Sequence, residues 1–185
     1  RSFKKIVGYR NLDELTRKLG RFTSRVLKDD CLDLPAKVYL SRDVELTDEQ
    51  RAAYDQMKRD AVATIEGSSS VATVVITQLL RLHQIACGHL TTEAGVVGLP
   101  NRRIAALLET LEETQGKAII WATYRHDLAE IERALREEYG KESVVSYHGG
   151  TSPDDRAAAI VAFQDPSSPV RWFVGQEATG GYGLT

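Results

Sequence analysis

The chain contains 185 residues, of which 42% are hydrophobic and 27% are charged, and its formal net charge is −2. This composition excludes a disordered chain and fits a globular domain with a small appendage. The longest apolar stretches, such as 118–122, are too short to cross a bilayer, so no membrane partner is expected. The two cysteines, Cys31 and Cys87, are typical of reduced thiols inside a cell rather than of a disulfide framework.

The N-terminal part, residues 1–46, is predicted to be a basic linker with a short helix and a strand. Residues 1–28 carry nine basic and two acidic side chains, a local charge of +7. Such an arm fits a contact with nucleic acid or an acidic partner, and equally a solvated helix face. Asn11 is the expected cap of a helix that ends at Gly20. Three leucines share one side of this helix, namely Leu12, Leu15 and Leu19.

Residues 36–46 alternate between apolar and polar side chains, which predicts an extended and half-buried strand. Val38, Leu40, Val44 and Leu46 share the apolar face.

Residues 47–100 are predicted to form a helical insertion, and its first helix has a clear start. Thr47 and Gln50 match a capping box, in which each side chain bonds the backbone N–H of the other residue. The helix is predicted over about 48–66, because a run of glycine and serine at 67–70 breaks the pattern.

A second helix is predicted over about 71–87, since apolar residues recur there on one stripe and Gly88 follows as the stop. The stripe consists of Val71, Val75, Leu79, Leu82 and Ala86. Residues 88–100 are then predicted to form a loop or a small hairpin.

From residue 101 onward, helical patterns alternate with short apolar strands at 118–122, 143–147 and 170–174. This alternation is typical of an α/β fold whose parallel strands are joined by right-handed crossovers. Ser152, a proline and two aspartates form a strong helix start, with the acids near the positive end of the helix dipole. Both tryptophans, Trp121 and Trp172, are predicted to be core. The apolar residues carried by the predicted helices are Ile104, Leu108, Leu111, Leu128, Ile131, Leu135, Ile160, Val161 and Phe163.

Ligands gather at the carboxyl edge of a parallel sheet, and three predicted loops meet there. These loops, residues 123–126, 148–152 and 175–185, supply an aromatic residue, an arginine, two histidines, hydroxyls and glycines. Helix N-termini and glycine-rich turns present backbone N–H groups that bind phosphates. The edge is therefore predicted to bind a phosphorylated ligand or a nucleic-acid backbone. Taken alone, the last glycine-rich loop fits a purely structural turn about as well.

Other chemistry is less favoured. The sequence has no G-x-x-x-x-G-K-[ST] phosphate loop and no aspartate-rich metal site on these loops. His83, Cys87 and His89, with Cys31 as a fourth ligand, match no zinc spacing, so a helix end packed in the core explains them better. A Cys87 nucleophile with His83 as its base lacks any residue that orients the histidine. We therefore predict no metal site.

The order of several segments resembles the second RecA-like lobe of Swi/Snf-family ATPases, a group of superfamily-two helicase-like proteins, particularly the compact versions of phages and bacteria. The resemblance runs over nearly the whole chain and rests on the order and spacing of the segments. They are an interlobe segment that leads to Leu34-Pro35, a helix start at 46–50 followed by Tyr54, a helix end at 79–89, a motif IV at 117–122, a His-Gly segment at 147–150 with Arg156 and Phe163, and a motif V at 180–185.

This resemblance implies a three-layer α/β fold, in which a RecA-like parallel sheet is flanked by helices and carries a helical N-terminal extension. Residues 101–185 correspond to an incomplete lobe two that is truncated at its C-terminal end. The implied parent protein is an ATP-driven translocase or helicase-like enzyme on double-stranded DNA, in which two lobes close around ATP and Mg²⁺. Its implied partners are DNA and the first lobe of the same parent chain, in the bacterial or phage-infected cytoplasm, or in the nucleus of a eukaryote.

The resemblance also assigns roles to single residues. The residues expected to face the DNA backbone are Tyr124, Arg125, His148, Gly149, Arg156, Thr179 and Gly180. Gly181 and Gly183 are expected near the nucleotide, and no residue is expected to be catalytic in this chain. Gly175 and Gln176 stand where the family usually carries a hydroxyl.

The sequence starts at Arg1 without an initiating methionine and stops at Thr185 within the glycine-rich loop, so we expect a fragment that is cut beside its functional site. Such a fragment is expected to hydrolyse no ATP, because the first lobe and the arginine-finger motif of the family are missing from it. One alternative is a non-catalytic module that binds nucleic acid or protein. Another is an independent α/β enzyme for a phosphorylated ligand, which the missing acid/base residues disfavour. The sequence predicts no oligomeric state.

Overall fold

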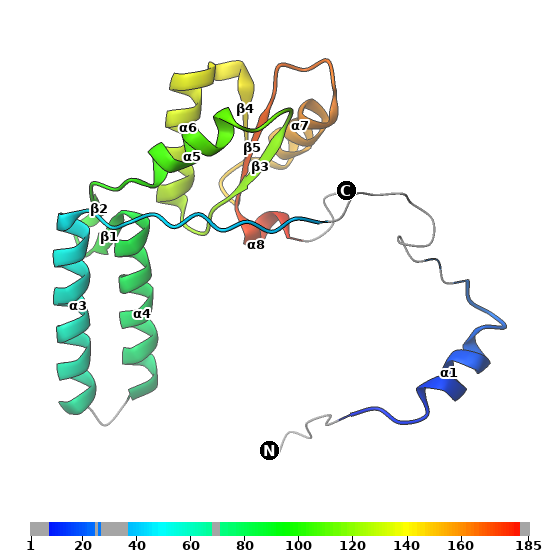
Figure 1. Ribbon diagram of the computed structural model, residues 1–185, viewed down its shortest axis with the longest axis horizontal. Helices are drawn as coiled ribbons and strands as arrows, with labels where there is room; N and C mark the ends of the chain where they lie inside the picture. The colour runs from blue at the N-terminus through cyan, green and yellow to red at the C-terminus, as the bar shows by residue number, and fades with distance from the viewer. Residues whose placement is uncertain (1–7, 25, 27–36, 68–70, 182–185) are drawn as a thin grey trace. The chain divides into compact units, whose positions relative to one another are not determined.

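The computed structural model describes residues 8–24, 26, 37–67 and 71–181, without the side chains of residues 63–67 and 71–74 (Figure 1). The chain divides into two compact units, Arg1–Arg42 and Asp43–Thr185, each with its own architecture. Within the described residues, no helix is long and apolar enough to cross a membrane.

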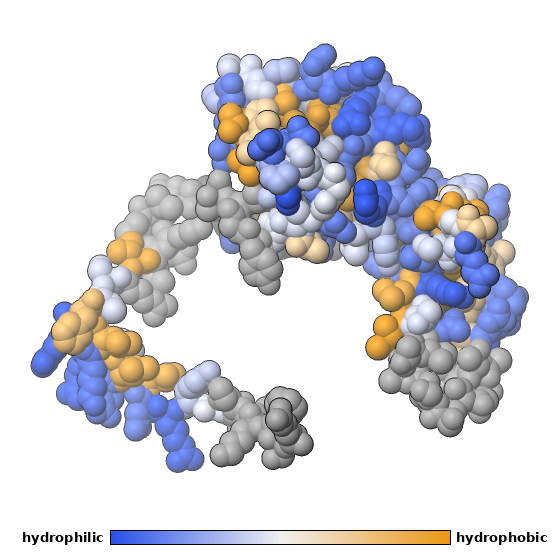
Figure 2. All heavy atoms as spheres, turned by 180° about the vertical axis from the view of Figure 1, so that it is seen from behind, coloured by the Kyte–Doolittle hydropathy of each residue, from blue (hydrophilic) through white to orange (hydrophobic). Residues whose placement is uncertain are grey.

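The first unit contains the predicted short helix, α1 (Leu12–Leu19), which ends at Gly20 as expected. Asn11 occupies the predicted N-cap position, but it has a left-handed backbone conformation and its side chain makes no capping hydrogen bond. Leucines cover one side of α1 and charged residues the other (Figure 2). No residue of α1 is buried, so its leucine face is exposed.

The strand predicted over 36–46 is not formed by the described residues 37–46. Val38 and Tyr39 are exposed, and Leu40 is 91% exposed. Alternation yields a strand only where a neighbouring strand bonds the backbone and a core receives the apolar face. Only the last part of the pattern is half-buried, at Val44 and Leu46.

The second unit starts with two helices, α3 (Asp48–Gly67) and α4 (Val71–Cys87), which closely match the predicted ranges. The capping box is confirmed, since the Thr47 N–H donates to Gln50 Oε1 (3.1 Å) and the Gln50 N–H donates to Thr47 Oγ1 (3.2 Å). Gln50 is only 1% exposed, and its amide donates to the carbonyl oxygen of Ile85 on α4 (2.9 Å). One residue therefore both starts α3 and fastens it to α4. Residues 68–70, the predicted break, lie outside the described residues.

The apolar stripe predicted on α4 is only partly right. Val75, Leu82 and Ala86 are half-buried, but Leu79 is exposed, and Ile85 is the fully buried residue of the helix. The side chain of Val71 lies outside the described part. The stripe is rotated because α4 packs against α3 on one side only, which leaves Ile76, Leu79 and Leu80 at the surface.

Gly88 ends α4 as predicted, and the following residues form the hairpin that the sequence left open against a loop. Gly88 has a φ of +94°, and a Cβ there would lie 2.3 Å from Asn101 Nδ2, so only glycine fits. Two antiparallel strands follow, β1 (His89–Thr92) and β2 (Gly95–Gly98).

The remainder is the predicted alternation of helices and parallel strands. The strands are β3 (Ala118–Trp121), β4 (Val144–Tyr147) and β5 (Trp172–Gly175), in the order β3-β5-β4. The connecting elements are α5 (Arg103–Glu112), α6 (Arg125–Tyr139), a short 3-10 turn η1 (Lys141–Ser143), α7 (Pro153–Gln164) and α8 (Glu177–Gly180). The predicted start of α7 is confirmed, because the Asp155 N–H donates to Ser152 Oγ (3.1 Å) and a proline occupies the first turn.

Helices cover both faces of the sheet, so the three-layer α/β prediction is confirmed (Figure 1). On one face, α5 and α6 enclose the main core around Leu128, Leu135 and Trp172. On the other face, α7 packs against β4 and β5, and the rings of Phe163 and Phe173 lie 5.3 Å apart. Trp172 is fully buried, as predicted.

Trp121 was also predicted to be core, but it is 38% exposed. Alternate residues of β3 point to opposite faces, and α7 does not extend over the side that carries Ile119 and Trp121. An apolar cleft of about 310 Å³ lies there, between these residues and Phe163.

Candidate functional site

The carboxyl ends of the three parallel strands are held together by backbone bonds and by one side chain. The Ala122 N–H donates to the Gly175 carbonyl (3.0 Å), and the Gln176 N–H donates to the Tyr147 carbonyl (2.9 Å). The side-chain amide of Gln176 donates to the Thr123 carbonyl (3.0 Å). The sequence singled out Gln176 only because the family that the chain resembles usually carries a hydroxyl there. In the structure, Gln176 joins the ends of β3, β4 and β5.

The segment after β4 is packed between side chains from two other elements. The Gly150 N–H donates to His148 Nδ1 (3.0 Å). A Cβ on Gly150 would lie 2.7 Å from Arg125 Nη2 and 3.2 Å from the His148 ring, so the glycine permits a close approach of both groups. Gly149 lies beside α8, because its Cβ would be 4.0 Å from Thr179 Oγ1. Arg125, His148, Gly149 and Thr179 therefore lie together, as the sheet-edge argument predicted.

Arg125 belongs to the first turn of α6 instead of the loop in which the sequence placed it. The same correction applies to His126, and to Thr179 and Gly180, which belong to α8. β3 ends at Trp121, one residue earlier than predicted, and α6 begins at Arg125. β5 ends at Gly175, one residue later than predicted, and α8 begins at Glu177, directly after Gln176.

The remaining predicted residues lie apart from this group. The Arg156 guanidinium lies 5.8 Å from the centre of the Tyr147 ring, and its Nε is buried without a hydrogen-bond partner among the described residues. Gly180 is buried and lines the apolar cleft beside Trp121. Gly181 is exposed at the end of α8, where a Cβ would lie 2.8 Å from the Glu177 carbonyl oxygen. Gly183 lies outside the described residues.

His148 faces an acid, Glu132, that the sequence did not single out. Its Nδ1 accepts the Gly150 N–H, so a neutral ring carries its proton on Nε2, which lies 4.0 Å from Glu132 Oε1. Glu132 also pairs with Arg136 (3.2 Å), whose guanidinium donates to Ser146 Oγ (3.3 Å). Its position one helical turn before Arg136 on α6 was the only sequence signal that it carried.

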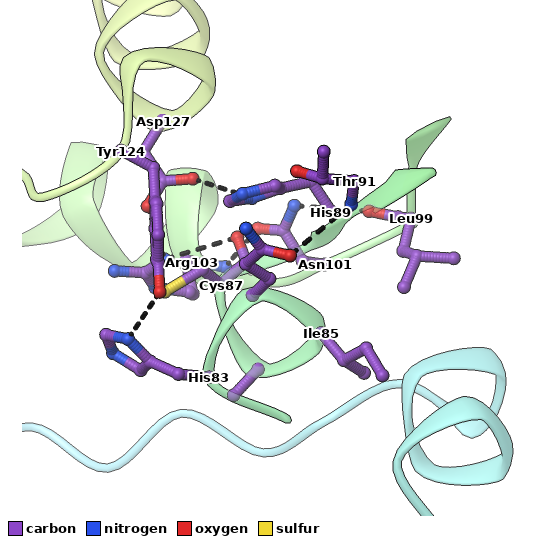
Figure 3. A network of polar contacts seen from close by, with 12 residues as sticks. His83, Ile85, Cys87, His89, Thr91, Leu99, Asn101, Arg103, Tyr124 and Asp127 are labelled. Carbon is purple, nitrogen blue, oxygen red and sulfur yellow. Dashed lines mark hydrogen bonds and ion pairs between the residues drawn. The ribbon is translucent and has the colours of Figure 1, made fainter. Parts of the chain in front are cut away.

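Next to this edge lies a second polar group, which we call the Asp127 cluster: His83, His89, Arg103, Tyr124 and Asp127 (Figure 3). Asp127 Oδ1 lies 3.1 Å from His89 Nδ1, and Asp127 Oδ2 lies 3.4 Å from Arg103 Nη1. The Tyr124 hydroxyl is 2.9 Å from His83 Nδ1. The sequence singled out both histidines but did not predict these pairings, because Asp127 lies 38 residues after His89 and Tyr124 lies 41 residues after His83.

Burial controls the ionisation of this cluster. It lowers the pKa of His89 below the usual 6.5, although the nearby Asp127 carboxylate opposes the shift. Burial also raises the pKa of the Tyr124 hydroxyl and of the neighbouring Cys87 thiol. At neutral pH the cluster thus contains neutral His89, a neutral phenol and a protonated thiol, which is not the state of a cysteine nucleophile.

The ring nitrogens of the two histidines point to different partners: His83 contacts the Tyr124 hydroxyl, and His89 contacts the Asp127 carboxylate. Among the described residues, no three histidine, cysteine or acidic side chains are arranged to hold a metal ion. Cys31, the fourth ligand considered from the sequence, lies outside these residues.

Comparison with known proteins gives matches at the level of the fold. No family model and no curated protein sequence matches the chain. It is similar to a Sulfolobus solfataricus SWI2/SNF2 ATPase C-terminal domain, with a TM-score of 0.63 and 23% identity, over 77% of this chain and 64% of that one.

Two further matches are the S. solfataricus SWI2/SNF2 ATPase core domain (TM-score 0.62) and the same ATPase core in complex with dsDNA (TM-score 0.64). Both are 22% identical to this chain and cover 89% of it. The chain spans 36% of each core and just under two thirds of the separate C-terminal domain. It therefore has the RecA-like α/β fold of that C-terminal domain.

Proposed function

We propose that this chain is the C-terminal RecA-like lobe of a Swi/Snf-type ATPase that moves along double-stranded DNA. The observation that carries the proposal is the convergence of Arg125, His148, Gly149 and Thr179 at the carboxyl edge of the sheet. The fold they stand on is that of a SWI2/SNF2 ATPase C-terminal domain, and one matching core was solved with dsDNA.

These groups suit a phosphate backbone. The Arg125 guanidinium supplies positive charge, the Thr179 hydroxyl supplies a hydrogen bond, and the exposed Gly149 allows a phosphate to approach the main chain. None of them forms a surface that reads base edges, so the contact we propose is independent of sequence and depends on salt. We assign Tyr124, Arg156 and Gly180 to the same proposed contact because the family resemblance places them at the DNA backbone.

In the proposed activity, ATP and Mg²⁺ are bound mainly by the first RecA-like lobe and not by this chain. The sequence contains no phosphate loop, and the described sheet edge carries no group of acidic side chains that fits Mg²⁺. We assign to this chain only a place near the nucleotide, at Gly181 and Gly183. The first RecA-like lobe is the partner that would bind the rest.

The DNA contact is tested by comparing two arginines of α6. Arg125→Ala should weaken binding of the chain to a labelled DNA duplex by about threefold to tenfold and lower the slope of log affinity against log salt by about 1. Arg133→Ala removes the same charge from the same helix, but Arg133 pairs with Glu130 and Glu137. Fluorescence anisotropy at several salt concentrations measures both. Equal losses for the two variants would contradict a specific role of Arg125.

A second candidate function is a non-catalytic module that binds nucleic acid or protein through its N-terminal arm. The charge of +7 over residues 1–28 and the exposed leucines of α1 favour it. Removing residues 1–42, which form a separate unit, distinguishes the two functions. If the sheet edge binds DNA, the remaining unit should keep the Arg125-dependent part of the affinity; if the arm is the binding site, that dependence should be absent.

A further inference from the structure

Asp127 stands where four elements meet. It is 7% exposed and lies in the first turn of α6. Its two oxygens contact Arg103 at the start of α5 and His89 on β1. The Arg103 guanidinium also donates to the carbonyl oxygen of Cys87, the last residue of α4 (3.2 Å). A single buried carboxylate thus joins the end of the α3–α4 pair to the sheet domain.

The same carboxylate fixes a residue at the working edge. Tyr124 precedes α6, and its ring packs edge-on against His89, with ring centres 4.9 Å apart. Its hydroxyl bonds to His83, one turn before the end of α4. Figure 3 shows Asp127 beside Tyr124, with one contact from Asp127 to His89 and one from the Tyr124 hydroxyl to His83. Movement of His89 therefore changes the surroundings of the Tyr124 ring, and Tyr124 in turn contacts His83.

The electrostatic balance explains why a carboxylate is required. A buried charge needs a partner, and Arg103 is the cation that faces Asp127, since burial keeps His89 neutral at pH 7. The other titratable side chains near His89 are His126, whose ring centre is 4.8 Å away, and Tyr124. Asparagine at position 127 would keep an oxygen that can accept a hydrogen bond, but it would remove the negative charge that compensates the Arg103 guanidinium.

We propose that Asp127 is a positioning residue, which holds Tyr124 at the sheet edge through His89 and sets the attachment of α4 through Arg103. The inference rests on the proposed DNA contact of Tyr124, but the positioning itself is measurable without DNA.

The first experiment tests the positioning by nitrogen-15 NMR of the imidazole rings, which can be resolved because the chain has only four histidines. Asp127→Asn should shift the ring resonances of His89 and, through Tyr124, those of His83, while those of His148 stay unchanged. Glu137→Gln, which neutralises an exposed acid of the same helix, should shift none of them. A shift confined to His89 would overturn the proposal. If Asp127→Asn does not fold, Arg103→Gln is measured in the same way. This variant removes the positive charge that faces Asp127 from the half-exposed side of the cluster.

The second experiment tests the link to DNA with a double-mutant cycle, in which binding of a DNA duplex is measured. Asp127→Asn removes a negative charge, so simple electrostatics predicts tighter binding, as for Glu137→Gln. Positioning predicts the opposite, an affinity weaker by about threefold to tenfold, as for the loss of one hydrogen bond. In a Tyr124→Ala background, Asp127→Asn should cause no further loss.

Additive losses in the cycle would overturn positioning through Tyr124. A Tyr124→Ala variant that binds DNA as tightly as the wild type would instead contradict the proposed DNA contact, and the NMR shifts would still decide the positioning.

Discussion

At the scale of single residues, the candidate site brings together groups that lie far apart in the sequence. His89 is 2% exposed and lies against Asp127, and Gly150 lies between His148 and Arg125. Each of these residues is ordinary in the sequence. The geometry gives His89 an altered pKa and makes a side chain at Gly150 sterically costly.

His89 makes stability depend on pH. Because burial lowers its pKa in the folded state, the unfolded chain binds a proton more readily, and the free energy of unfolding should fall as pH falls below the usual value of 6.5. One such proton contributes at most about 1.4 kcal/mol per pH unit. Urea unfolding between pH 7.5 and 5.5 should show a shallower pH dependence in His89→Gln than in the wild type. An unchanged slope in His89→Gln would contradict the assignment.

At the scale of elements, local signals were reliable where they needed no distant partner. The capping box of α3, the serine and proline at the start of α7 and the glycine stop of α4 all formed as predicted. The strand predicted at 36–46 failed, because a strand needs a neighbour and its described residues have none. The predicted apolar stripe of α4 was wrong at Leu79, because the side of the helix that is buried carries Ile85 instead.

Gln50 both caps α3 and holds α3 against α4, so its replacement should lower the stability of the fold. Gln50→Ala removes the cap of the Thr47 N–H and the buried bond to the Ile85 carbonyl. We expect the free energy of unfolding, measured with urea, to fall by about 1–3 kcal/mol. Gln56→Ala, on the exposed side of the same helix, should change it by less than about 0.5 kcal/mol. Similar values for both variants would show that the buried amide contributes little.

At the scale of the whole molecule, the described sheet edge lacks the acidic groups that a complete phosphoryl-transfer site needs to hold Mg²⁺. The chain has the fold of a SWI2/SNF2 ATPase C-terminal domain and spans about a third of the matching cores. Phosphoryl transfer in such ATPases requires charge from groups that cradle the phosphates and the metal ion. Among the described residues, the sheet edge carries an arginine, a histidine, a hydroxyl and an exposed glycine, but not that set of groups.

We therefore expect the purified 185-residue chain to release no phosphate from ATP above background, with or without duplex DNA. A coupled phosphate-release assay measures this directly. Turnover that duplex DNA stimulates and that Arg125→Ala reduces would contradict the prediction and place a complete active site in this chain.

The sequence by itself determined the alternation of helices and strands, the parallel sheet, and the edge at which Arg125, His148 and Thr179 gather. It did so because hydrophobic periodicity and helix caps are local, and because parallel strands must bring their carboxyl ends to one edge. Only the tertiary structure decided that Gln176 joins the strand ends, that Glu132 faces His148 and that Asp127 meets His89 and Arg103. These contacts join residues far apart in the chain, and no local pattern specifies which buried charges will meet when the layers pack.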